Sequence, residues 1–158
     1  MKKGARKMKK TNVNKINELK MSLYSLSVNE STSRAMIGAF CSQLNPTATE
    51  LADIKCALSE AVTNSIVHAY KDKPGLIYIT VTVFEDKNLK LVIKDKGIGI
   101  SDVKCAMQPL YTTDRSGERS GMGFCVMESF MDKIHVSSKE GKGTTVTMYK
   151  RITGERFI

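Results

Sequence analysis

Apolar and polar positions repeat with two different periods along this chain, and turn-forming residues mark the changes of period. Between residues 21 and 28, apolar side chains alternate with polar ones, which predicts a first strand. From about residue 30 to residue 44, apolar side chains recur at steps of three and four, the period of a helix with one buried face. Asn29 is a suitable N-cap for this helix, and Asn45-Pro46 is expected to end it.

A second helix is predicted from residue 47 to about residue 70, because Thr47 and Glu50 have the spacing of a capping box. Beyond it, β-rich runs and glycine-containing turns predict strands at 76–84, 89–94, 133–138 and 144–150, and helices near 101–107 and 121–131. This order predicts an α+β fold, a single-domain two-layer sandwich in which helices cover one face of a mixed, mainly antiparallel sheet.

Length and composition favour one cytoplasmic domain. The chain has 158 residues, of which 41% are hydrophobic, enough for one buried core. No run approaches the roughly 20 apolar residues that a membrane helix needs, and the lysine-rich start lacks the apolar part of a secretory signal. The four cysteines form no C-x-x-C pair, so we expect reduced and mostly buried thiols instead of a zinc site or a disulfide framework.

The net charge of +9 is concentrated at the beginning of the chain. Residues 1–20 contain eight Lys or Arg residues and one Glu, so +7 lies there and +2 remains for the rest. We expect residues 1–20 to form a basic, disordered leader and residues 21–158 to form the domain. Because the domain is nearly balanced, direct DNA binding is not expected, and non-specific attraction to RNA or acidic partners ranks second.

Two residues of the second predicted helix combine into a possible metal and catalytic site. Glu60 and Asn64 stand four apart, so a helix presents their carboxylate and amide oxygens on one face. An amide oxygen is a hard ligand of the kind that Mg²⁺ takes, which makes Asn64 the candidate metal ligand. Taken alone, such a pair is more often simply exposed to solvent.

Glycines lie at two later points where a nucleotide could be bound. Asp95 ends a predicted strand, and the flexible Gly97 and Gly99 after it would let a planar base approach the backbone. Gly121 and Gly123 open a predicted helix, whose free N–H groups and positive end suit phosphate. Each motif has a common structural explanation, such as an Asx turn at Asp95. The polar stretch 108–120 has no core-forming period and is expected to be a mobile lid.

Four segments together are much more specific than any one of them. They are Glu60-Ala61-Val62-Thr63-Asn64-Ser65-Ile66-Val67-His68-Ala69, Asp95-x-Gly97-x-Gly99, Arg119-Ser120-Gly121-Met122-Gly123-Phe124 and Gly141-x-Gly143-Thr144-Thr145. In this order and spacing they resemble the N, G1, G2 and G3 boxes of the Bergerat ATPases, the superfamily shared by sensor histidine kinases, type II topoisomerases and mismatch-repair ATPases.

The resemblance implies an ATP or ADP site with Mg²⁺. Asp95 would accept a hydrogen bond from the adenine amino group, Thr144 would complete the adenine end, and Arg119 would clamp the terminal phosphate. The other expected nucleotide contacts are Asn64, Gly97, Gly99, Thr112, Thr113, Gly121, Met122, Gly123 and Phe124. For His68 and His135 a structural role is favoured.

Several shorter stretches resemble one branch of this superfamily. They are Leu26-Ser27-Val28-Asn29-Glu30-Ser31, Ser59-Glu60-Ala61-Val62-Thr63-Asn64, Gln108-Pro109-Leu110-Tyr111-Thr112-Thr113, Glu118-Arg119-Ser120-Gly121-Met122-Gly123-Phe124 and Met127-Glu128-Ser129-Phe130-Met131. They are similar to the anti-sigma-F factors of endospore-forming bacteria, which are also protein serine kinases, from about residue 15 almost to the end.

This second resemblance implies partner switching. An ATP-bound dimer would hold a sporulation sigma factor, and an anti-anti-sigma protein would displace it and be phosphorylated on serine. Glu60 would accept the proton of that serine, and Arg34 with Glu30 would form the sigma-binding surface. Two alternatives remain: a general-stress anti-sigma kinase of the same family, and a non-catalytic ATP-sensing module. Glu60 favours an enzyme over a sensor.

Overall fold

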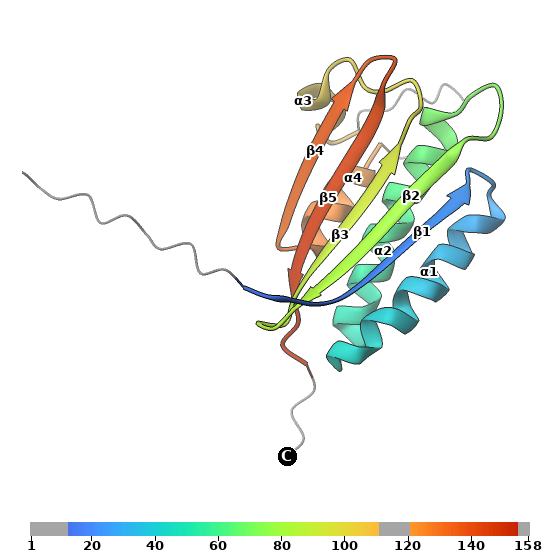
Figure 1. Ribbon diagram of the computed structural model, residues 1–158. Coiled ribbons are helices and arrows are strands. Elements are labelled where there is room, and N and C mark those ends of the chain that lie inside the picture. Colours follow the sequence, from blue (N-terminus) through green and yellow to red (C-terminus); the bar gives the residue numbers. More distant parts are fainter. Residues whose placement is uncertain (1–12, 111–120, 155–158) are drawn as a thin grey trace, which may run out of the picture.

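One antiparallel sheet organises the molecule. The computed structural model describes residues 13–110 and 121–154, and the chain runs through them from β1 to β5 (Figure 1). The strands are β1 (Lys15–Tyr24), β2 (Leu76–Phe84), β3 (Asn88–Asp95), β4 (Lys133–Lys139) and β5 (Gly143–Arg151). Their order in the sheet is β1-β2-β3-β5-β4, and each neighbouring pair is antiparallel within the described residues. The predicted α+β class is confirmed, without a parallel pair in this part of the chain.

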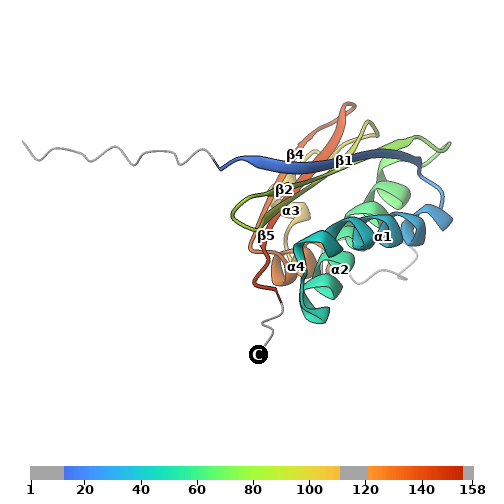
Figure 2. The same ribbon diagram turned by 60° about the horizontal axis from the view of Figure 1, so that its bottom comes forward.

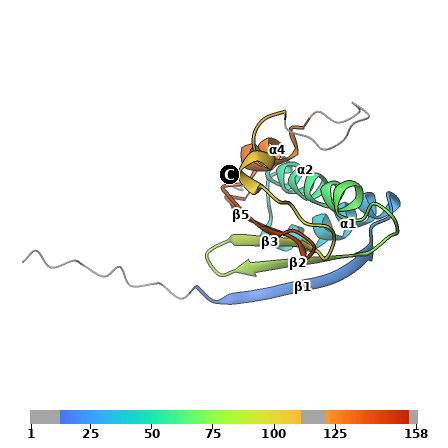
Figure 3. The ribbon, with the colours of Figure 1, turned by 90° about the horizontal axis from the view of Figure 1, so that it is seen from above.

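Helices lie on one face of this sheet and leave the other face uncovered (Figures 2 and 3). They are α1 (Val28–Cys41), the 3₁₀ turn η1 (Ser42–Leu44), α2 (Ala48–Asn64), the π-helical turn η2 (Ser65–Ala69), α3 (Val103–Ala106) and α4 (Gly123–Phe130). The structure is therefore the two-layer sandwich that the sequence predicts. None of the described helices is long and apolar enough to cross a bilayer.

The core lies between the two layers and follows the predicted periods. Alternate residues of β2 and β3 point toward the helices, and Ile79, Val81 and Leu91 are each exposed by 1% or less. Ile37 of α1 and Leu58 of α2 face them and are also fully buried. Burying one such side chain contributes about 1.5–3 kcal/mol, so this interface fixes how α2 sits on the sheet.

The first strand begins earlier than the sequence analysis predicts. β1 starts at Lys15, six residues before Met21, so residues 15–20 of the expected leader belong to the sheet. Pairing with residues 80–84 of β2 orders this polar segment. Glu18 adds ion pairs with Lys15 at 3.3 Å and with Lys20 at 3.1 Å. The local sequence is too polar to form a core, but a neighbouring strand satisfies its backbone.

Helix ends also differ from the expected ones. Ser27, not Asn29, is the N-cap of α1, although its side chain makes no capping hydrogen bond, and the Asn29 side chain donates to the Tyr24 carbonyl at 2.8 Å. The capping box of α2 is confirmed: Thr47 Oγ1 accepts from Glu50 N at 3.1 Å, and Glu50 Oε2 accepts from Thr47 N at 2.9 Å. α2 ends at Asn64, and the π-helical turn η2 replaces its expected last turn.

The expectation of mostly buried cysteines was wrong. Cys41 is buried, and burial raises the pKa of its thiol to about 12. Cys56 is exposed, while Cys105 and Cys125 are partly exposed. The exposed thiol lies on the solvent side of α2, where the helical period allows any small side chain.

Candidate nucleotide-binding site

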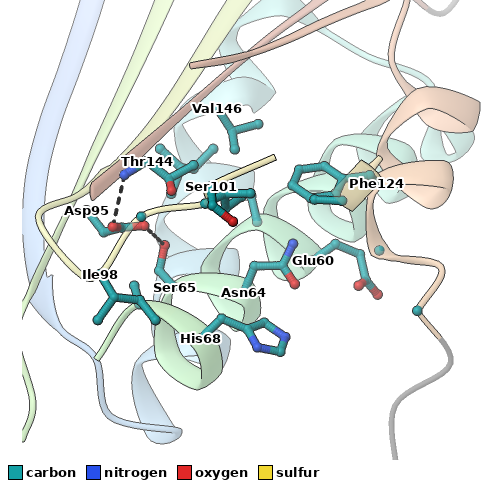
Figure 4. Close-up of a pocket in the computed structure, with 18 of the residues that line it drawn as sticks. Glu60, Asn64, Ser65, His68, Asp95, Ile98, Ser101, Phe124, Thr144 and Val146 are labelled. Atoms are coloured by element: carbon teal, nitrogen blue, oxygen red, sulfur yellow. Dashed lines mark hydrogen bonds between the residues drawn. The ribbon is translucent and has the colours of Figure 1, made fainter. Parts of the chain in front are cut away.

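A cavity of about 500 Å³ opens between α2, the loop after β3, the start of α4 and the start of β5. Figure 4 shows Asp95 and Ser65 together at one end and Glu60 and Asn64 at the other. The structure thus brings residues from all four predicted segments to one place. The predicted residues that line the cavity are Glu60, Asn64, Asp95, Gly99, Gly121, Met122, Gly123, Phe124 and Thr144.

The remaining predicted nucleotide contacts have other outcomes. Thr112, Thr113 and Arg119 lie outside the described residues, as does most of the expected lid. Gly97 is described but is not part of the cavity lining. His68, for which a structural role was favoured, does line the cavity (Figure 4).

The end of the cavity near Asp95 is called the base end here, after the predicted contact of Asp95 with the adenine base. It is built around the buried carboxylate of Asp95, which is 4% exposed. Its Oδ1 accepts from the backbone N–H groups of Gly97 at 3.0 Å and Thr144 at 3.1 Å. Its Oδ2 accepts from the Ser65 hydroxyl at 3.0 Å. Three donors therefore fix this carboxylate, and a carboxylate has room for about one more.

Thr144 is held by a second hydroxyl at the same end. Its Oγ1 lies 2.8 Å from Ser138 Oγ, which also accepts from Ile100 N at 2.8 Å. Thr144 thus serves the site through two groups: its backbone N–H orients Asp95, and its hydroxyl contacts Ser138 of β4, which in turn accepts from Ile100 in the loop after β3.

The glycines of the β3 loop pack against protein backbone. A Cβ on Gly97 would lie 2.2 Å from the Ala69 carbonyl oxygen. Gly99 has φ +74°, and a Cβ there would lie 2.2 Å from the Lys139 carbonyl oxygen. The missing side chains therefore let the loop close on η2 and on β4. This packing shapes the base end, and Gly99 also lines the cavity.

At the opposite end, Glu60 and Asn64 have no partner in the part of the chain that the structure describes. Glu60 and Asn64 project from successive turns of α2 beside the start of α4 (Figure 4). A Cβ on Gly123 would lie 3.1 Å from Glu60 Oε2 and 3.5 Å from Asn64 Oδ1, so only glycine leaves this space open. Within residues 13–110 and 121–154, neither side chain forms a hydrogen bond or an ion pair. The polar atoms of Glu60 and Asn64 are therefore available to a bound ligand or metal ion.

The donor set at this end suits a magnesium phosphate. The Asn64 amide oxygen is a hard ligand of the kind that Mg²⁺ takes, and Mg²⁺ uses few protein ligands when it also binds phosphate. The first N–H groups of α4 have no acceptor within the helix, so they are available to phosphate oxygens. Gly121, with φ +69°, makes the turn that brings the chain to this helix.

Comparison with known proteins identifies the family. The model of the histidine kinase-like ATPase domain matches residues 26–150. The chain is 51% identical over 137 residues to the anti-sigma F factor of Clostridium novyi, an alignment that covers 86% of this chain and 95% of that protein. It is also 51% identical over 143 residues to the anti-sigma F factor of Geobacillus sp., covering 90% and 97%. The chain belongs to the anti-sigma F factor family.

Solved structures show the same fold in more distant proteins. The RsbU and RsbW domains of Rv1364c from Mycobacterium tuberculosis match with a TM-score of 0.64 at 18% identity, over 90% of this chain and 35% of that one. A histidine kinase domain from Erythrobacter litoralis matches with a TM-score of 0.51 at 16% identity, over 78% and 65%. As a histidine kinase-like ATPase domain, this member of the anti-sigma F factor family binds ATP and ADP.

The predicted partner surface of this anti-sigma F factor family member lies on α1. Arg34 Nη1 is 3.6 Å from Glu30 Oε1, and the Arg34 side chain is 48% exposed. Glu30 Oε1 also accepts from the hydroxyl of Ser59 in α2 at 2.5 Å. Glu30 therefore anchors Arg34 to α2, outside the cavity lining.

Sequence reasoning missed three hydroxyl groups that shape the base end. Ser65 and Ser138 have the contacts described above, and Tyr70 donates to the Leu76 carbonyl at 2.7 Å and accepts from Lys96 N at 2.8 Å. Burial raises the pKa of Tyr70. For Ser65 a signal existed, because it continues the buried row of Ala57 and Ala61 at steps of four, where an apolar residue is expected.

Proposed function

We propose that this chain is an ATP-dependent anti-sigma factor that holds a sporulation sigma factor and phosphorylates its anti-anti-sigma antagonist on serine. One observation carries the catalytic part: Glu60 and Asn64 have no partner among the described residues, yet they share a cavity with Asp95, whose carboxylate accepts three hydrogen bonds. Asp95 would position the adenine base, while the Glu60 carboxylate and the Asn64 amide would remain available to the phosphates and the substrate. This arrangement fits phosphoryl transfer from ATP, in which the protein mainly positions the reactants and stabilises charge.

The proposed reaction divides the cavity between its two ends. Asp95 accepts from the adenine amino group, which places the triphosphate toward Asn64 and the start of α4. Glu60 takes the proton of the substrate serine hydroxyl as that oxygen bonds to the γ-phosphorus. The bond from the γ-phosphorus to the bridging oxygen breaks, and ADP leaves with that oxygen. Mg²⁺ held by Asn64 would neutralise phosphate charge.

The residues outside the described ranges complete the proposal. Arg119 would stabilise the charge on the transferred phosphoryl group, and Thr112 and Thr113 would contact the nucleotide from the lid. All three follow from the resemblance of their segments to the family.

Partner binding is proposed for α1, in a cytoplasmic homodimer. Arg34 is exposed and held in place by Glu30, as suits an arginine that pairs with an acidic group on a sigma factor. The names of the relatives favour a sporulation sigma factor over a general-stress one.

A phosphotransfer assay tests this function. The purified chain is mixed with γ-labelled ATP, Mg²⁺ and anti-anti-sigma proteins of the sporulation and general-stress types, and the labelled residue is mapped by mass spectrometry. We expect label on one serine of the sporulation type. Transfer to the general-stress type alone would move the chain to that branch, and ATP binding without transfer to either would indicate a sensing module.

A further inference from the structure

Ser65 occupies a position in the cavity that the proposed mechanism leaves without a role. It is the first residue of the π-helical turn η2, it is 4% exposed, and it lines the cavity beside Asp95. Wide π-helical turns are rare and often occur at functional sites. Here the turn begins where α2 passes from the Glu60–Asn64 end to the base end.

The contacts of Asp95 make its two oxygens unequal. Oδ1 already accepts from two backbone N–H groups, those of Gly97 and Thr144. Within residues 13–110 and 121–154, Oδ2 accepts only from Ser65, at 3.0 Å. A carboxylate oxygen accepts about two hydrogen bonds, so the remaining capacity is on Oδ2. The oxygen that would meet a ligand is therefore the one that Ser65 holds.

The same hydrogen bond decides what Ser65 itself can offer. A serine hydroxyl has one proton and two lone pairs, and Ser65 donates its proton to Asp95. Its oxygen is left with acceptor capacity only. Asp95 Oδ2 and Ser65 Oγ thus lie side by side as two acceptors. An N–H group of a bound base can donate to them, whereas a carbonyl oxygen of the base would be repelled by them. Unpaired buried polar groups are costly, so the wrong base is rejected strongly.

We propose that Ser65 is a positioning residue for base specificity, which holds Asp95 Oδ2 and makes the base end select purines with an amino group at position 6. A purine with a carbonyl at position 6 would bring its lone pairs against two acceptors. This inference rests on the nucleotide site of the proposed function and adds the residue that determines its choice of base.

Nucleotides that differ only at position 6 distinguish a role of Ser65 in base specificity from a role in stabilising the fold. ATP and purine riboside triphosphate differ only in the 6-amino group, and inosine triphosphate has a carbonyl there. Calorimetric titration with all three gives affinities for the unmodified chain, Ser65→Ala, Ser65→Thr and the control Ser33→Ala. Ser33 is also a buried helical serine, but its hydroxyl donates to the Glu30 carbonyl of α1 outside the cavity lining. The ratio of two affinities from one preparation does not depend on the folded fraction.

We expect Ser65→Ala to weaken ATP binding by roughly 5- to 20-fold, between the usual effects of losing a neutral and a charge-assisted hydrogen bond, and to change purine riboside triphosphate binding less than about twofold. The preference for ATP over inosine triphosphate should fall, Ser65→Thr should restore part of it, and Ser33→Ala should leave every ratio unchanged. Equal losses for ATP and purine riboside triphosphate in Ser65→Ala, or no loss, would overturn the role of Ser65. An unmodified chain that binds both equally would instead overturn the base assignment of Asp95.

Discussion

The two ends of the cavity differ in how far the protein already satisfies their polar groups. At the base end, Asp95 accepts three hydrogen bonds, and the Thr144 hydroxyl lies within hydrogen-bond distance of Ser138. At the phosphate end, Glu60 and Asn64 have no such partner among the described residues. The base end is therefore organised before any ligand binds, whereas in the proposed function the phosphate end would gain its contacts from the ligand. This difference suits the proposed kinase, which would hold the adenine base in a fixed position while the γ-phosphoryl group and the serine proton are transferred at the other end.

The largest effect is expected on phosphoryl transfer, from a substitution at the phosphate end alone. Glu60→Gln keeps the shape and hydrogen-bonding capacity of the side chain but removes the base, so phosphoryl transfer should fall by roughly 10²- to 10⁴-fold. ATP affinity, measured by calorimetry on the same preparation, should stay within a few fold. A variant that phosphorylates its partner at the unmodified rate would leave Glu60 without the proposed role.

The next prediction compares the two ends of the cavity by the loss of ATP affinity when one residue at each end is replaced. Asp95→Ala and Asn64→Ala should each weaken ATP binding by roughly tenfold to a thousandfold, because each removes a group that contacts the ligand. Titrations with and without Mg²⁺ distinguish them. Asn64→Ala should lose the Mg²⁺ dependence of binding, while Asp95→Ala should keep it. Unchanged affinity in both variants would contradict the assignment of the cavity.

Arg34→Ala tests a region outside both ends. An exposed interface arginine can contribute about 2 kcal/mol or more, so sigma-factor binding should weaken by more than about tenfold. ATP binding should be unaffected, because Arg34 does not line the cavity. A pull-down with each partner beside an ATP titration measures both. Undiminished sigma binding would reject this surface, and lost ATP binding would show that the two sites are coupled.

Two glycines sharpen the comparison between an organised end and an open one. Gly143 has φ +96°, and a Cβ there would lie 2.2 Å from the Asp95 carbonyl oxygen, so Gly143→Ala should destabilise the fold by about 1–3 kcal/mol. Gly123→Ala has no such strain, but its Cβ would crowd Glu60. We expect urea unfolding to detect only the first substitution and ATP titration of folded protein to detect the second. Equal stability losses in both variants would refute this distinction.

The smallest effect concerns the far end of α2, remote from the cavity. Burial raises the pKa of Glu50, but hydrogen bonds from Thr153, Thr47 and Gly154 outweigh burial and lower it from 4.5 to about 2. Its contribution to stability is thus present above about pH 4.5 and is lost as the pH falls toward 2.

Glu50→Gln should therefore show less loss of stability than the unmodified chain between pH 6 and pH 3, by about 1 kcal/mol in urea unfolding, the usual size of a cap contribution. Glu128→Gln, at an exposed position of α4, is the matched control and should follow the unmodified chain. Parallel pH curves for all three proteins would argue against the cap as the source.

Local sequence determined the elements whose signals are short-range. The capping box at Thr47 and Glu50, the β2–β3 hairpin and the shared face of Glu60 and Asn64 depend on residues within a few positions of one another. Helical and strand periods, cap spacing and turn residues act at that range, so these predictions needed no knowledge of the fold. The four nucleotide segments were likewise recognisable from their order along the chain.

Tertiary structure decided what depends on contacts between distant segments. Lys15 to Lys20 became a strand because β2 pairs with them. Gly97 and Gly99 serve loop packing because Ala69 and Lys139 lie against them. Ser65 meets Asp95, 30 positions away, through a turn that the helical period does not predict. Hydrogen bonds and steric contacts act over a few ångströms in space, and only the folded chain sets which residues come that close.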